Sequence, residues 1–279
     1  MIEILFSPLS YTFMQRGMAA AILVGVLCSV VGCYVILRSM AFLGDAVAHA
    51  ILPGVAIAYL LEGSLTIGAL LAAILVGLGI GFLTRQGNVK EDTAIGILFT
   101  AALALGVALI STIRTYAVDL SHILFGNILG VSSSDLWLTI GLSVIVLGTI
   151  ILLYKPLLVV SFDPVLAATL RLPIGLLNNL LMVLLAFTIV IALQTVGIGL
   201  VAAMLVTPPA TAYLLTRRIA PMMFLSALIG VFSSVVGLYL SFYFNVASGA
   251  AIVLTATFLF VLAFLFAPNR GVIWQKVPR

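Results

Sequence analysis

The sequence has very few charged residues: Asp, Glu, Lys and Arg make up 7% of its 279 residues, against about 25% in a typical soluble protein. Hydrophobic residues make up 64% of the chain. Apolar runs follow one another with short gaps from residue 17 to residue 267, which leaves no stretch long enough for an independent soluble domain. The sequence therefore predicts an all-α integral membrane protein with one membrane domain.

The chain also lacks the motifs of several enzyme classes. It has no GxxxxGK[ST] phosphate loop, so it cannot hydrolyse ATP by that route unaided, and it has neither HExxH nor GxSxG. An intramembrane aspartyl protease needs two catalytic carboxylates within its spans, and Asp45 is the only clear one. Cys28 and Cys33 match no zinc or redox spacing and are interpreted as small packing residues. These absences argue against an enzyme.

Nine apolar segments are long enough to cross a bilayer, which needs about 20 residues for each helix. They lie near 17–37, 44–61, 65–84, 93–112, 135–154, 176–193, 197–215, 221–243 and 248–267. Residues 1–16 lack the basic start of a signal peptide and are expected to form an interfacial segment. Residues 17–267 form the predicted permeation domain, and 268–279 a cytoplasmic tail.

The basic residues test this count, because Lys and Arg accumulate on the cytoplasmic side of membrane proteins. With an external N-terminus and a cytoplasmic C-terminus, ten of the twelve lie on the cytoplasmic side: Arg38, Arg85, Lys90, Lys155, Arg171, Arg217, Arg218, Arg270, Lys276 and Arg279. Arg16 and Arg114 are the exceptions. The net charge of +4 is spread singly or in pairs, so it indicates topology rather than a nucleic-acid partner.

Proline and glycine mark local features within the spans. Pro53 in the second span, and Pro208 and Pro209 in the seventh, are expected to kink or partly unwind their helices. Gly77 and Gly81 form a GxxxG pattern that indicates helix packing.

The second span carries two ionisable residues, Asp45 and His49. A charged group at the bilayer centre costs about 2.5–3.5 kcal/mol on insertion scales, so such residues usually line a cavity or serve a function. Residues four apart on a helix share one face, so a carboxylate oxygen and an imidazole nitrogen can converge there. Three interpretations remain open: an internal hydrogen bond, a proton relay, or a site for a borderline divalent ion such as zinc, manganese or iron.

Two further segments contain candidate polar sites. In SFDPVLAATLRLP, residues 161–173, Asp163 and Pro164 form a helix start and Pro173 ends the helix. This short cytoplasmic helix is either a connector on the membrane surface or a docking site for a soluble partner. In VDLSHILFGNILGV, Asp119 and His122 are three apart in an external segment and are interpreted as a loop cap, a docking contact or a second ion site.

Five segments, taken in order, resemble the permease subunits of bacterial ABC importers for manganese, zinc and iron. They are LRSMAFLGDAVAHAILPGVAIAYLL, EDTAIGILFTAALALGVAL, VDLSHILFGNILGV, SFDPVLAATLRLP and VGIGLVAAMLVTPPATAYLL. The resemblance covers nearly the whole chain. The VDLSHILFGN version, with His122, is more similar to the manganese and iron members than to the zinc members.

The resemblance implies a multi-pass homodimer in the bacterial cytoplasmic membrane. It also implies two copies of a separate ABC ATPase and an external metal-binding delivery protein. Asp45 and His49 would be the metal ligands of the translocation path, for a transported ion rather than a permanent cofactor. Residues 161–173 would be the helix that couples to the ATPase, with Asp163, Pro164, Val165, Leu166, Ala167, Ala168 and Arg171 at the contact.

Two other kinds of transporter fit parts of the same pattern. A proton-coupled secondary metal transporter would use Asp45 and His49 as a relay and would need no ATPase. A permease for chelates or vitamins would need a wide cavity, whereas two convergent ligands favour a bare ion.

Overall fold

The computed structural model describes residues 8–85, 89–112 and 128–267, and this part of the chain is helical with no strand. Its helices are η1 (Pro8–Ser10), α2 (Thr12–Leu37), α3 (Leu43–Ala50), α4 (Leu52–Leu60), α5 (Leu65–Arg85), α6 (Glu91–Ser111), η2 (Ile128–Gly130), α8 (Ser133–Leu152), α9 (Tyr154–Phe162), α10 (Pro164–Thr169), α11 (Ile174–Val196), α12 (Ile198–Leu215), α13 (Ile219–Phe244) and α14 (Ser248–Phe266).

Nine of the described helical segments are long and apolar enough to span a membrane, which confirms the predicted count. Each overlaps its predicted range, and the second is divided into α3 and α4. The first begins at Thr12, five residues before the expected boundary at residue 17. The interfacial position of residues 1–16 stays a prediction, and the tail at 268–279 lies outside the described residues.

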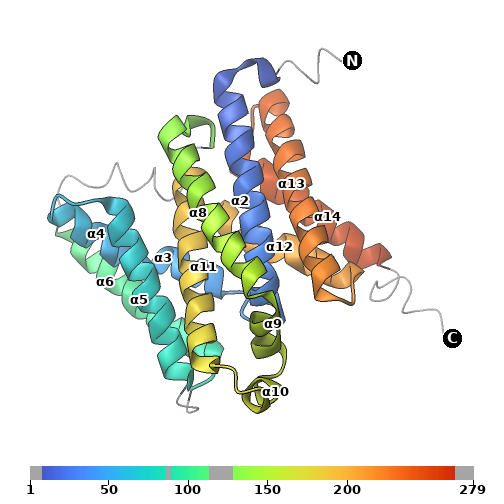
Figure 1. The fold of residues 1–279 in the computed structure, drawn as a ribbon. Helices are drawn as coiled ribbons and strands as arrows, with labels where there is room; N and C mark the ends of the chain where they lie inside the picture. The colour runs from blue at the N-terminus through green and yellow to red at the C-terminus, as the bar shows by residue number, and fades with distance from the viewer. Residues whose placement is uncertain (1–7, 86–88, 113–127, 268–279) are drawn as a thin grey trace.

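The spans form a bundle around α2, which packs against α8, α11, α12 and α13 (Figure 1). Helices α4, α5 and α6 form a separate group on one side, where α5 packs against α11. The short helix α3 connects this group to the rest, since it contacts α5, α6, α11 and α12. The six-residue helix α10 lies at the bottom of Figure 1, and we call this end of the bundle the α10 end.

Two helix crossings depend on glycine, because a side chain there would meet backbone. A Cβ on Gly32 of α2 would clash with the carbonyl oxygen of Leu205 on α12. Gly54 of α4 and Gly68 of α5 face each other in the same way, each against the other's carbonyl oxygen. The predicted pair Gly77 and Gly81 does pack against α11, but at looser distances: their Cβ positions would lie 3.5 Å from Met182 and 3.3 Å from Asn179.

Of the two expected effects of Pro208 and Pro209, a kink or a partial unwinding, the unwinding does not occur, because α12 continues through both prolines. Pro209 has no N–H to donate to the Leu205 carbonyl four residues earlier. The backbone of α2 at Gly32 covers that oxygen. Prolines are tolerated in membrane helices where a neighbouring helix contacts the exposed backbone in this way.

Candidate functional site

Asp45 and His49 lie on one face of α3, as their spacing predicted. The Nδ1 atom of His49 is 3.5 Å from the Oδ1 atom of Asp45. The carboxylate and the imidazole therefore share one small region of the helix surface. The site is built within a single helix of eight residues, so its internal geometry does not depend on distant parts of the chain.

A shorter contact fixes the orientation of the His49 ring. Its Nδ1 atom is 2.9 Å from the backbone carbonyl oxygen of Asp45. A carbonyl oxygen can only accept a hydrogen bond, so Nδ1 carries the hydrogen and Nε2 of the neutral ring keeps its lone pair. The edge of the ring also packs against Phe99 of α6, with ring centroids 6.0 Å apart. This arrangement is typical of metal-binding histidines, which hold one ring nitrogen by a carbonyl and bind metal with the other.

The face of α3 that carries the pair is open in the single chain. The side chains of Asp45 and His49 are 52% and 32% exposed, and Phe42, one turn before Asp45, is 78% exposed. The opposite face is buried, with Val47 only 2% exposed. Lipid would be an unfavourable neighbour for an ionisable pair at membrane depth. We infer that this face is covered by protein or water.

Two contacts set the position of α3 in the bundle. A Cβ on Gly44 would lie 2.9 Å from the Leu205 side chain, so α3 rests directly on α12. After Ala50 the helix ends, as Pro53 predicted, because proline has no N–H for the His49 carbonyl. That carbonyl accepts from the N–H of Ile51 instead. The break therefore begins at Ile51, only two residues beyond His49.

The short helix predicted within residues 161–173 is present as α10, but it ends at Thr169, four residues before Pro173, so Pro173 does not end it. Its cytoplasmic location stays a prediction. The Oδ1 atom of Asp163 accepts hydrogen bonds from the backbone N–H groups of Val165 and Leu166, at 3.0 and 2.9 Å. Pro164 occupies the first turn, and Arg171 ends the segment in a left-handed conformation with φ of 54°. The local geometry at Asp163 is thus the predicted N-cap.

Most of the surface of α10 is exposed and apolar. Val165 is 74% exposed and Leu166 is 47% exposed, whereas Ala167 is buried against the bundle. Exposed apolar side chains at the end of a bundle are typical of a contact with another protein. Val165 and Leu166 therefore make α10 a candidate docking element.

The described part of the chain does not bring a complete metal-ligand set together. No group of three or more His, Cys, Asp or Glu side chains that could hold a metal occurs among the described residues. The second candidate, Asp119 with His122, lies outside the described residues. Among the described residues, Asp45 and His49 thus offer two candidate ligands.

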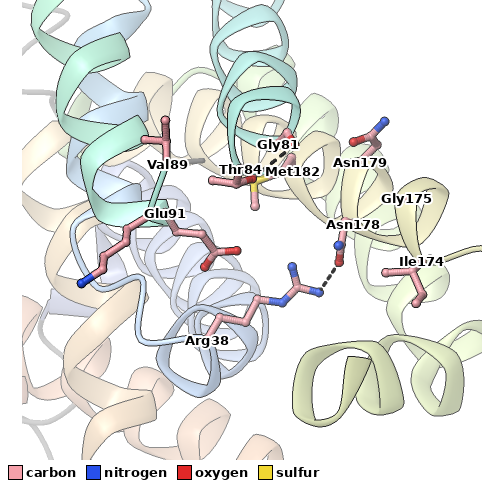
Figure 2. Close-up of a pocket in the computed structure, with 11 residues that line it drawn as sticks. Arg38, Gly81, Thr84, Val89, Glu91, Ile174, Gly175, Asn178, Asn179 and Met182 are labelled. Carbon is pink, nitrogen blue, oxygen red and sulfur yellow. Dashed lines mark hydrogen bonds between the residues drawn. The ribbon is translucent and has the colours of Figure 1, made fainter. Parts of the chain in front are cut away.

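Sequence reasoning missed a polar cavity of about 700 Å³ at the α10 end (Figure 2). Its lining includes Arg38, Glu91 and Asn178, which come from three separate helices or their ends. The sequence marked Arg38 only as an indicator of topology. No local pattern could have predicted the cavity, because Arg38 and Asn178 are 140 residues apart in the chain.

Comparisons with known proteins identify the family of this chain. The model of the ABC 3 transport family matches residues 10–267. The manganese transport system membrane protein MntC of Halalkalibacterium halodurans is 54% identical over 265 residues, which are 95% of this chain and 91% of that protein. A probable iron transport system membrane protein of Haemophilus influenzae is 38% identical and covers 97% of this chain and 99% of its own length.

A solved structure agrees with the fold described above. The structure of PsaBC from Streptococcus pneumoniae in complex with Fab contains a chain with a TM-score of 0.87 and 42% sequence identity. The match covers 99% of this chain and 100% of that chain. The family model spans nearly all of the membrane domain, and these relatives align over almost their full length. The protein therefore belongs to the ABC 3 transport family, as the five motifs that resemble metal-importer permeases predicted.

Proposed function

We propose that this chain is the permease of an ATP-driven importer of divalent transition-metal ions, with manganese as its cargo. The observation that carries the proposal is the Asp45–His49 pair on the open face of α3. Carboxylate oxygen and imidazole nitrogen suit manganese, iron and zinc. The names of the MntC relative and of other family members favour manganese over the other two.

The permease acts as a homodimer in this proposal. One chain offers two ligands, and a second copy that meets the first at the open face of α3 supplies two more. Phe42, Asp45 and His49 then lie at the contact between the copies, away from lipid. Four ligands of this kind hold a divalent ion while Nδ1 of His49 stays bonded to the Asp45 carbonyl.

ATP hydrolysis belongs to a separate chain. The permease has no phosphate loop, and α10 offers exposed apolar side chains on a capped helix. One ATPase subunit docks on each α10, which places the α10 end in the cytoplasm. An external metal-binding protein delivers the ion at the opposite end.

Transport follows alternating access. Closure of the two ATPase subunits moves both α10 helices, and the resulting shift of α3 changes the distance between the ligands of the two copies. The ion loses part of its ligand set and leaves towards the cytoplasm. Because the four ligands are divided between two copies, separation of the copies releases the ion, and transport requires a site that an ion can leave.

The test is manganese uptake in cells that lack their own importers. The cells receive this chain with a cognate ATPase and delivery protein, and permease expression is measured in every strain. The proposal predicts that uptake is lost with Asp45→Asn, with His49→Ala, and with a catalytically inactive ATPase. Competition by zinc and iron identifies the preferred ion.

Two results would contradict the proposal. Uptake by Asp45→Ala/His49→Ala at equal expression would show that the pair is not on the path. Uptake that continues without ATPase activity and follows a pH gradient would instead support the proton-coupled transporter.

A further inference from the structure

The Arg38 side chain lies in the polar cavity at the α10 end and is half-buried there. Burial lowers the pKa of its guanidinium, and the charge of the Glu91 carboxylate raises it. Figure 2 shows the Glu91 carboxylate and Asn178 on opposite sides of the guanidinium. Arginine is effectively always protonated in proteins, so the group stays charged. The cavity thus contains a fixed positive charge.

Arg38 makes two hydrogen bonds, one to each side of the α10 segment. Its Nη2 atom donates to Oδ1 of Asn178 at 2.7 Å, drawn as a dashed line in Figure 2. Its Nε atom donates to Oγ of Ser161 at 3.2 Å. Hydrogen bonds from a charged donor are roughly twice as strong as neutral ones.

The two acceptors bracket the docking helix in the chain. Ser161 is on α9, two residues before the Asp163 cap of α10, and Asn178 is on α11, in the helix that follows α10. Asp163 in turn holds the first turn of α10. A displacement of α10 therefore moves the groups to which Arg38 is bonded.

The other side of Arg38 leads directly to the candidate metal site. Arg38 ends α2, and the chain turns through Ser39, whose φ is 58°, into α3. Backbone hydrogen bonds close this turn: Ser39 N–H donates to Ile36 at 3.0 Å, and Met40 N–H donates to Val35 at 3.0 Å. Leu43 N–H, at the start of α3, donates to Met40 at 3.0 Å. The connection between Arg38 and Asp45 is a closed, hydrogen-bonded turn.

We propose that Arg38 is a positioning residue that transmits the movement of α10 to the metal-bearing helix α3. It does so through its hydrogen bonds to Ser161 and Asn178 on one side and the turn into α3 on the other. This inference rests on the proposed function, since it assigns the route by which ATPase movement reaches the ligands.

The test measures manganese uptake and ATP hydrolysis in the same vesicles, which contain the permease, its ATPase and the delivery protein. With Arg38→Gln, hydrolysis continues, but the manganese taken up for each ATP falls about tenfold, within the usual range of coupling between distant sites. If Arg38 only stabilised the fold, the substitution would lower manganese uptake and ATP hydrolysis together and leave their ratio unchanged.

Variants of the acceptor test whether the hydrogen bond itself matters. Asn178→Ala lowers the ratio of manganese to ATP, whereas Asn178→Asp, which keeps an acceptor oxygen, restores it. Asn179→Ala is the matched control, because Asn179 lines the same cavity while the Arg38 guanidinium is bonded to its neighbour. The double variant Arg38→Gln/Asn178→Ala has the same ratio of manganese to ATP as Arg38→Gln alone, because both changes break the same hydrogen bond.

The outcomes separate this inference from the proposed function. If the wild-type complex shows no ATP-dependent manganese uptake, the proposed function is wrong. If the wild-type complex works and Arg38→Gln keeps its ratio, or loses hydrolysis and uptake in parallel, the inference about Arg38 is overturned. If Arg38→Gln does not assemble, Ser161→Ala/Asn178→Ala, which leaves the guanidinium in place, decides the question in the same assay.

Discussion

The absence of a Cβ atom at Gly32 affects the position of the candidate site. Its missing side chain lets α2 approach the Leu205 carbonyl of α12, and the Leu205 side chain in turn contacts Gly44 of α3. Three helices thus meet at Leu205, close to the helix that carries Asp45. We expect that a change at Gly32 moves α12 and, through it, α3.

The substitution Gly32→Ala is therefore expected to destabilise the protein. Overpacking in a core typically costs about 1–3 kcal/mol, which exceeds the gain of about 0.5–1 kcal/mol from replacing glycine within a helix. The Tm of the purified permease in detergent should fall. The control is Gly148→Ala on α8, where a Cβ would meet nothing within 4 Å, and its Tm should stay level or rise. An equal Tm for the two variants would refute the crossing as described.

The chemistry of the site was more predictable than its setting. Asp45 and His49 were identified from four-residue spacing within an apolar run, because both facts are local to the sequence. The bond from Nδ1 to the Asp45 carbonyl was not predictable, since a side chain four residues on can reach either the carboxylate or the carbonyl. The acceptor that is bonded determines which ring nitrogen faces outward, and only the three-dimensional structure identifies that acceptor.

At the scale of elements, α10 is short enough to depend on its cap. It has six residues, and helices of that length are marginal without support from other contacts. Two of its free N–H groups are satisfied by Asp163. The shape of the proposed docking surface formed by Val165 and Leu166 should therefore depend on the side chain at position 163.

Asp163→Ala removes this cap and should weaken the proposed contact with the ATPase. Loss of an N-cap costs about 0.5–2 kcal/mol of helix stability, so α10 would be frayed for much of the time. Less ATPase should co-purify with the permease, and the dissociation rate measured by surface plasmon resonance should increase. Asp163→Asn keeps an oxygen acceptor and should retain binding. Equal ATPase recovery with Ala and Asn would mean that the cap does not shape the docking surface.

The predicted elements differ from the observed ones where long-range contacts override a local rule. The nine spans follow from apolar length, because the bilayer requires it, and Pro53 breaks the second span as expected. Pro208 and Pro209 obey the same local rule, yet α12 continues, because α2 covers the carbonyl that Pro209 leaves without a donor. The close crossing of Gly54 and Gly68 was missed for a similar reason: neither glycine belongs to a GxxxG pattern.

At the scale of the whole molecule, the open face of α3 has a second copy of the chain as its proposed partner. Phe42 and Asp45 are exposed there, while Ala48, on the same helix, is fully buried. The native Cys28 and Cys33 are buried as well. Thiol chemistry can therefore report on this face without removing them.

Phe42→Cys should be cross-linked between two chains by a short bis-maleimide in native membranes, giving a band at twice the monomer mass. The matched variant Ala48→Cys should not react, because its side chain points into the bundle. Wild-type protein shows the background from the native cysteines. A monomeric band for Phe42→Cys, with complete modification by a single maleimide, would count against a dimer through α3.

The low hydrophobicity of the second span has a consequence for synthesis of the protein. Leu43–Leu60 is the least hydrophobic of the nine candidate spans found among the described residues, since it contains Asp45, His49 and Pro53. The ionisable residues make partition from the translocon into lipid less favourable for this segment than for the other spans. We expect it to stay near the exit of the translocon until its neighbours, α5 and α6, have been made. Integration of the helix that carries Asp45 and His49 would then be a late, cooperative step of biogenesis.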